Sequence, residues 1–359
     1  VKFLLYSLVG GLLMLAALIG LYVVSAQELG TGTFDFTTLT NLNIDPGTQK
    51  LLFLGFFIAF AIKAPLVPFH TWLPDAAAAS TPGTAVLLVG VLDKVGTFGM
   101  IKLCLPIFPA ASEFYAPVII VLCVVGIIYG ALLAIGQTDL KRLIAYTSVS
   151  HFGFIGLGIF AMTTQGQSGS TFYMLNHGFS TGALFLIAGF LMTRRGSRLI
   201  ADFGGVYRVA PVLAGLFLIA GLSSLSLPGM SSFISEFLVL VGTFEKYTVA
   251  AVIATLGIVL AALYILLMYQ RTMTGPVKDG CEKMTDVKGR EALAIIPMLV
   301  LLVALGVYPK PVLDVVNPAV ERVMQQTGQR DPLPTVKPLA AEEAKERVSN
   351  VSSSIEGGA

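Results

Sequence analysis

Residues 48–69 read TQKLLFLGFFIAFAIKAPLVPF. The run 51–62 holds only apolar residues and one glycine, and it leads directly into Lys63, Pro65 and Pro68. A helix of about twenty residues spans the hydrocarbon core of a bilayer, and proline interrupts a helix. This stretch therefore predicts a broken transmembrane helix that carries a lysine deep in the membrane.

The composition of the whole chain is that of a membrane protein. Of 359 residues, 55% are hydrophobic and 12% are charged, whereas a soluble domain has about 25% charged residues. A soluble enzyme is thereby excluded, and a net charge of +2 gives no support for nucleic acid as a partner. The three cysteines lack metal or redox spacing, and no nucleotide-binding glycine motif occurs, so we expect no cofactor and no metal in this chain.

Apolar runs of spanning length recur along the chain and predict an all-α, polytopic transmembrane helical bundle. A second broken helix is predicted at Leu227-Pro228-Gly229, inside a run too long for one straight crossing. Discontinuous helices in membranes tend to line ion sites. We expect a transmembrane domain over 1–320 and a polar tail over 321–359. The roughly nine runs are 3–25, 48–69, 82–105, 115–136, 143–162, 170–193, 209–243, 248–270 and 291–309.

Basic residues in the connecting loops predict the orientation. Successive loops alternate between a richly basic set and a poor set that holds only Lys50, Lys246 and Lys310. The basic set is expected to face the cytoplasm of a bacterial inner membrane, which places the C-terminal tail on the outer side. Its members are Lys2, Lys141, Arg142, Arg194, Arg195, Arg198, Arg208, Arg271, Lys278, Lys283, Lys288 and Arg290.

Two lysines lie inside predicted spans, where a charge costs several kcal/mol and needs a reason. Lys63 is thirteen residues past Lys50, which places it roughly 20 Å into the membrane. Lys94 lies near the middle of the next span, with Asp93 beside it. Neighbours on a helix point about 100° apart, so Asp93 is not automatically its partner. Both lysines are candidates for proton transfer; the alternative for Lys63 is a structural bond to freed carbonyls.

Three further ionisable residues are predicted to be buried. His151 is ten residues from Lys141, at a depth of about 15 Å, and His177 is the second buried histidine. Histidine relays protons through either ring nitrogen. Glu236 follows the Pro228-Gly229 break and is expected roughly 12 Å from the outer surface; alternatively, it only pairs with a neighbouring helix. We interpret Lys63, Lys94, His151, His177 and Glu236 as a lateral row of proton-transfer residues.

Three motifs carry a family resemblance. Residues 63–76 read KAPLVPFHTWLPDA, residues 140–151 read LKRLIAYTSVSH, and residues 227–237 read LPGMSSFISEF. The chain resembles the antiporter-like membrane subunits of respiratory complex I, whose relatives occur in cation/proton antiporters and membrane-bound hydrogenases. Glu236 resembles the subunit M (chain 4) type, because the L and N types carry a lysine at the matching place.

The resemblance implies a subunit of fourteen helices, built as two inverted five-helix repeats with one broken helix each. About nine of these helices are expected here, and the sequence begins with Val1. We therefore expect an N-terminally incomplete chain that lacks the glutamate partner of Lys63.

The implied function is proton translocation within a bacterial NADH-quinone oxidoreductase. Quinone reduction in other subunits would drive protons laterally from Lys63 through Lys94, His151 and His177 to Glu236. FMN, iron–sulfur clusters and quinone are expected in partner subunits, with L-, N- and K-type subunits and lipids as neighbours. The alternatives are a subunit of a sodium/proton antiporter or of a membrane-bound hydrogenase, and a membrane scaffold.

Overall fold

The computed structural model of the chain describes residues 1–333, and these residues are almost entirely helical. Extended backbone pairs within them only at an isolated bridge between Asp139 and Leu199. The predicted all-α fold is confirmed. The helices are α1 (Lys2–Leu29), α2 (Phe36–Thr40), α3 (Pro46–Lys63), η1 (Phe69–Thr71), α4 (Trp72–Ala79), α5 (Pro82–Leu87), η2 (Leu88–Leu92), α6 (Lys94–Gly99), η3 (Met100–Cys104), α7 (Leu105–Ile107), α8 (Pro109–Ile135), α9 (Leu140–Ala161), α10 (Thr164–Arg195), η4 (Ile200–Asp202), η5 (Val206–Arg208), α11 (Pro211–Ser224), α12 (Ser231–Lys246), α13 (Thr248–Met273), α14 (Gly289–Val307) and α15 (Lys310–Gln326).

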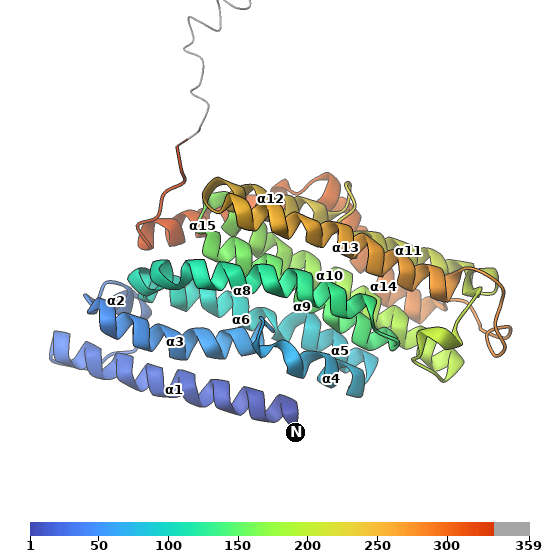
Figure 1. Cartoon of the computed structure of the whole chain (residues 1–359), viewed down its shortest axis with the longest axis horizontal. Helices are drawn as coiled ribbons and strands as arrows, with labels where there is room; N and C mark the ends of the chain where they lie inside the picture. Colours follow the sequence, from blue (N-terminus) through green and yellow to red (C-terminus); the bar gives the residue numbers. More distant parts are fainter. Residues whose placement is uncertain (334–359) are drawn as a thin grey trace, which may run out of the picture.

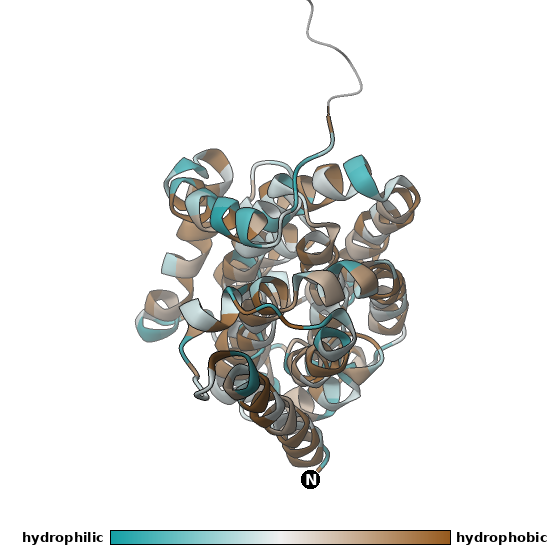
Figure 2. Ribbon diagram, turned by 90° about the vertical axis from the view of Figure 1, so that its left-hand side faces the viewer, coloured by the Kyte–Doolittle hydropathy of each residue, from teal (hydrophilic) through white to brown (hydrophobic). Residues whose placement is uncertain are grey.

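The long helices lie side by side along one axis of the molecule (Figure 1). Seven helical segments within residues 1–333 are long and apolar enough to cross a membrane. Of the nine predicted runs, the two that are not among these seven are 48–69 and 209–243, the two that the prolines interrupt. Many large apolar residues are exposed, among them Leu4, Leu8 and Leu12 of α1, and hydrophobic residues predominate along the helix ribbons (Figure 2). The chain is a multi-pass membrane protein.

α9 is the central helix of the bundle. In its most apolar stretch, 94% of the residues are buried, against 17% in α1. Small residues permit this position: a Cβ atom added to Gly153 would lie 2.7 Å from the carbonyl oxygen of Cys123 on α8. The backbones of α8 and α9 therefore touch, and any larger residue at 153 would push them apart.

Both predicted helix breaks are confirmed. α3 ends at Lys63, and a short turn through Pro65 and Pro68 leads into η1 and α4. α11 ends at Ser224 and α12 begins at Ser231, with Pro228 and Gly229 between them. Gly229 adopts a φ of 97°, in the left-handed region that favours glycine.

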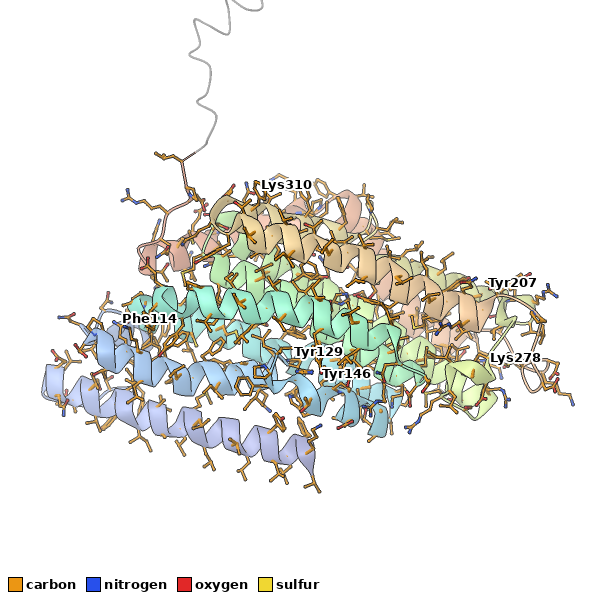
Figure 3. The ribbon with its side chains drawn as sticks, in the orientation of Figure 1. Phe114, Tyr129, Tyr146, Tyr207, Lys278 and Lys310 are labelled. Atoms are coloured by element: carbon orange, nitrogen blue, oxygen red, sulfur yellow. The ribbon has the colours of Figure 1, made fainter. Side chains whose placement is uncertain are left out.

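Lys278 of the predicted basic set and Lys50 of the poor set lie at opposite ends of the bundle. Tyr207 and Lys278 mark one end and Phe114 the other (Figure 3). The Nζ atom of Lys50 lies 3.6 Å from the ring centroid of Phe114, at the end with few basic residues. Which end faces the cytoplasm stays a prediction.

Residue 320, where the sequence predicts a domain boundary, lies within α15. Its buried residues include Val320, Val323 and Met324. Ser168 on α10 donates to Asn317 Oδ1 at 2.9 Å. The division at 320 stays a prediction, and most of the predicted tail, 334–359, lies outside the described residues.

Asp75 joins three helices at the basic end of the bundle. Its carboxylate lies 2.9 Å from Lys2 Nζ on α1 and 2.8 Å from an Arg142 guanidinium nitrogen on α9. The hydrogen bond from Lys2 is the main cause that lowers the pKa of Asp75. Because the pKa of Asp75 is lower in the folded state, its ion pairs stabilise the fold at pH values above the ordinary aspartate pKa. This stabilisation is lost as the pH falls through the lowered pKa.

We predict that Asp75→Asn lowers the thermal midpoint at pH 7. The loss is small, on the order of 0.5 kcal/mol per pair, because solvent screens these exposed charges. The difference from the unmodified protein should begin to shrink as the pH falls below about 3.9 and vanish only below the lowered pKa of Asp75. Thermal unfolding of the detergent-solubilised protein across this pH range measures it. Asp314→Asn, which breaks a pair within α15 only, is the control; a pH-independent difference would contradict the prediction.

Candidate functional site

The break in α3 places Lys63 at the last residue of that helix. The freed carbonyl oxygen of Ile62 accepts a hydrogen bond of 2.7 Å from the indole nitrogen of Trp72. Trp72 is 1% exposed, so the bond is shielded from competing water. Lys63 itself is half-buried, and its ammonium donates to Ser7 Oγ on α1 at 3.3 Å. The Nζ atom also lies 5.5 Å from the ring centroid of Phe3.

Lys94 begins α6 and reaches toward α10. Its Nζ atom lies 2.6 Å from His177 Nδ1 and 3.0 Å from Asp93 Oδ1, and it also donates to the carbonyl oxygen of Val89. The ammonium has three N–H donors, and each one has an acceptor. The ring of Phe152, 5.3 Å from Nζ, covers the same charge.

His177 on α10 and His151 on α9 form the centre of the site. Their ring centroids are 5.3 Å apart, edge to face, and the residues are 0% and 3% exposed. His177 Nε2 and His151 Nδ1 are buried, with no hydrogen-bond partner among the described residues. Each ring thus keeps one nitrogen available to exchange a proton.

Tyr173 lies between His151 and Glu236, and Tyr264 contacts His151 from another helix. The hydroxyl of Tyr264 on α13 lies 3.4 Å from His151 Nε2. The Tyr173 ring on α10 lies 5.8 Å from the His151 ring, and its hydroxyl donates to Glu236 Oε2 at 3.3 Å. Ser226, in the break between α11 and α12, donates to the same carboxylate oxygen. The carboxylate of Glu236 is 3% exposed and is held by neutral donors.

The second helix break is stabilised from α10. The Asn176 amide donates to the carbonyl oxygen of Ser231 at 3.0 Å and to Ser235 Oγ at 3.2 Å. Asn176 precedes His177 directly, so one turn of α10 both fixes the start of α12 and presents the histidine to Lys94. The broken helix and the ionisable row are therefore parts of one arrangement.

The structure brings together four of the five predicted site residues and leaves one apart. Lys94, His177, His151 and Glu236 form a connected line across α6, α10, α9 and α12. Lys63 contacts α1, and among the described residues no direct contact joins it to that line. Their roles in proton transfer stay a proposal.

Sequence reasoning missed the residues that bridge the line. Tyr173 lies four residues before His177, so the two share one helix face, a signal that could have identified it. Tyr264 and Ser226 gave no signal, because a tyrosine in an apolar run and a serine at a break are ordinary. The sequence places Asp93 beside Lys94, but helix geometry alone did not decide whether the two side chains pair. In the structure Asp93 forms an ion pair with Lys94.

Comparison with known proteins places the chain in a family. The family model described as NADH:quinone oxidoreductase/Mrp antiporter, transmembrane, matches residues 1–261. The chain belongs to this family. It is 61% identical over 342 residues to "NADH-quinone oxidoreductase subunit M" of Mycobacterium tuberculosis, covering 94% of this chain and 62% of that protein. The chain thus spans less than two thirds of that relative.

Solved structures match over most of the chain as well. A chain of respiratory complex I from Thermus thermophilus with bound NADH is 34% identical with a TM-score of 0.84, covering 91% of this chain and 68% of that one. The Mrp complex from Dietzia sp. DQ12-45-1b contains a chain that is 22% identical with a TM-score of 0.78, covering 91% and 69%. The second match shows a shared fold. The resemblance to antiporter-like complex I subunits is confirmed.

We predict that Trp72→Phe lowers the stability of the folded protein by weakening the turn that follows α3 beside Lys63. Phenylalanine keeps most of the buried ring but leaves the Ile62 carbonyl oxygen without its donor, a loss of about 1–3 kcal/mol. Thermal unfolding of the solubilised protein should show a lower midpoint. Tyr308→Phe, at a residue that is 60% exposed, provides the matched removal of a polar aromatic group. Equal midpoints for the two variants would count against the capping role.

Proposed function

We propose that this chain is the proton-translocating part of an M-type membrane subunit of a bacterial NADH-quinone oxidoreductase. The observation that carries the proposal is the buried line from Lys94 through His177 and His151 to Glu236. Each ionisable group buried in a membrane costs stability. A subunit that served only as a scaffold would gain nothing in return for that cost.

The chemistry of the line suits protons. Lys94 Nζ donates to His177 Nδ1 over 2.6 Å; a neutral histidine that gains a proton at Nδ1 can release the other from Nε2 toward His151. Beyond His151, the Tyr264 hydroxyl contacts the histidine, and Tyr173, whose ring lies beside His151, donates to Glu236. A sodium site would instead require several oxygen ligands around one point.

The coupling proposed for this subunit acts at a distance. Quinone reduction takes place in partner subunits, which carry the FMN and the iron–sulfur clusters. A change of charge near Lys63 then biases Lys94, and the proton leaves by Glu236. Neighbouring L-, N- and K-type subunits and lipids flank the bundle in the bacterial inner membrane, with the C-terminal tail on the outer side.

The degree of similarity favours an oxidoreductase subunit over an antiporter subunit. The chain is 61% identical to the mycobacterial subunit M and 22% identical to the matching chain of the Mrp complex. Glu236 adds support, because a carboxylate at this end of the row is the feature that resembles the M type.

We predict that Glu236→Gln removes most NADH-driven proton translocation while the complex still assembles. Glutamine fills the same space and can still accept from Tyr173 and Ser226, but it cannot take up and release a proton. The measurement is proton uptake per NADH oxidised, by the complete complex with the full-length subunit in liposomes.

Lys102→Gln is the control for this measurement, since Lys102 lies over the Phe36 ring, away from the line. Proton uptake by Glu236→Gln equal to that of the control would sink the proposal. Uptake that requires sodium but no quinone would instead identify an antiporter subunit.

We further predict that Tyr173→Phe slows proton translocation without removing Glu236 from its place. The substitution deletes one hydroxyl that donates to the carboxylate, while Ser226 continues to donate. Tyr115→Phe, a tyrosine stacked on Phe53, is the control. The same liposome assay compares the rates of proton translocation by the two variants. Equal rates for Tyr173→Phe and Tyr115→Phe would exclude Tyr173 from the path.

A further inference from the structure

Asp93 is a buried carboxylate that the line described above does not use. It lies between η2 and α6, and its exposed fraction is 0%. Oδ1 lies 3.0 Å from Lys94 Nζ. Apart from this ion pair, neither carboxylate oxygen has a hydrogen-bond partner among the described residues. The charge of Asp93 is therefore balanced by the lysine.

The local helix geometry supports the pairing. η2 is a π-helical segment, in which the Asp93 amide donates to the carbonyl oxygen of Leu88, five residues back, at 3.2 Å. In an α-helix that amide would donate to Val89. The Val89 carbonyl oxygen instead accepts from the Lys94 ammonium. The lysine side chain thus folds back along its own helix toward Val89. This brings its ammonium beside the Asp93 carboxylate, although side chains of adjacent residues on a helix normally point about 100° apart. Such π-helical insertions often occur at functional sites.

The ionisable groups nearest to the Asp93–Lys94 pair are bases, and Tyr173 of α10 donates to Glu236 instead. α10 contributes His177, α9 contributes His151, and α3 ends at Lys63. Gly96 of α6 packs against the backbone of α3 at Phe60 and Ala64. Asp93 is thus the acidic group within a basic cluster, and it lies at the end of the line opposite to Glu236.

We propose that Asp93 is the counter-ion of the Lys94–His177 pair. When the proton moves, an N–H bond on Lys94 Nζ breaks and an N–H bond on His177 Nδ1 forms, so the pair holds one positive charge before and after. The carboxylate of Asp93 balances that charge in both states. Asp93 acts as a positioning residue that keeps a proton in the pair, and this inference rests on the proposed function.

The first test removes the charge and keeps the shape. In Asp93→Asn the ammonium loses its ionic partner, so the pair gives up its proton more readily. The alkaline limb of the translocation-against-pH profile should move to lower pH by about 1–3 units, the usual effect of an opposite charge at this distance. Asp93→Glu should restore the profile in part. A structural role would change the amount of assembled complex but not the position of that limb.

The second test measures assembly of the complete complex. Lys94→Leu leaves the Asp93 charge buried without its partner and should reduce the yield of assembled complex strongly. Asp93→Leu combined with Lys94→Leu removes both charges and should restore the yield, because replacing a buried ion pair as a whole costs far less than breaking it. Asp314→Asn, at an exposed residue of α15, is the control in both tests.

The outcomes separate the two proposals. An unchanged pH profile in Asp93→Asn, or equal yields for the single and double leucine variants, would overturn the counter-ion. Glu236→Gln, measured in parallel, tests the proposed function: if it translocates normally, that function fails, and the assembly comparison still decides whether Asp93 and Lys94 depend on each other.

Discussion

The cost of placing a charge inside a bilayer governs the arrangement of this bundle. An ammonium group in hydrocarbon is tolerated only where each of its donors has an acceptor. Lys94 meets this condition with Asp93, the carbonyl oxygen of Val89 and His177 Nδ1. Two of these acceptors come from its own helix and one comes from α10, so this side chain ties the two helices together.

The same requirement explains how the broken helices survive at membrane depth. Each break frees backbone groups that water cannot satisfy there. Trp72 and Asn176 supply the missing donors at the two breaks, through bonds to the carbonyl oxygens of Ile62 and Ser231. Both donors are adjacent to the ionisable row. Trp72 bonds to the residue before Lys63, and Asn176 directly precedes His177, so each break is stabilised beside a member of the row.

Much of the fold could be predicted from the sequence, because apolar length and proline act locally. The nine runs and the breaks at Pro65 and Pro228 follow from spacing alone, and burial of Lys94 and His177 follows from depth along a helix. Contacts between helices could not be predicted. Whether Asp93 meets Lys94 depends on a π-helical segment that has no mark in the sequence, and the bridge through Tyr264 depends on how α13 packs near α9.

The separation of Lys63 from the line has a physical consequence for coupling. Lys63 contacts α1, yet α3 and α6 approach so closely that a Cβ atom on Gly96 would overlap the backbone of α3 at Phe60 and Ala64. Two charged groups on helices in backbone contact, in a medium of low dielectric, influence each other strongly without touching. The proposed coupling of Lys63 to Lys94 would therefore act through the field across this packed interface and not through a direct contact. Gly96 permits this close approach because it has no side chain, and Asp93, paired with Lys94, would set the charge on which the field acts.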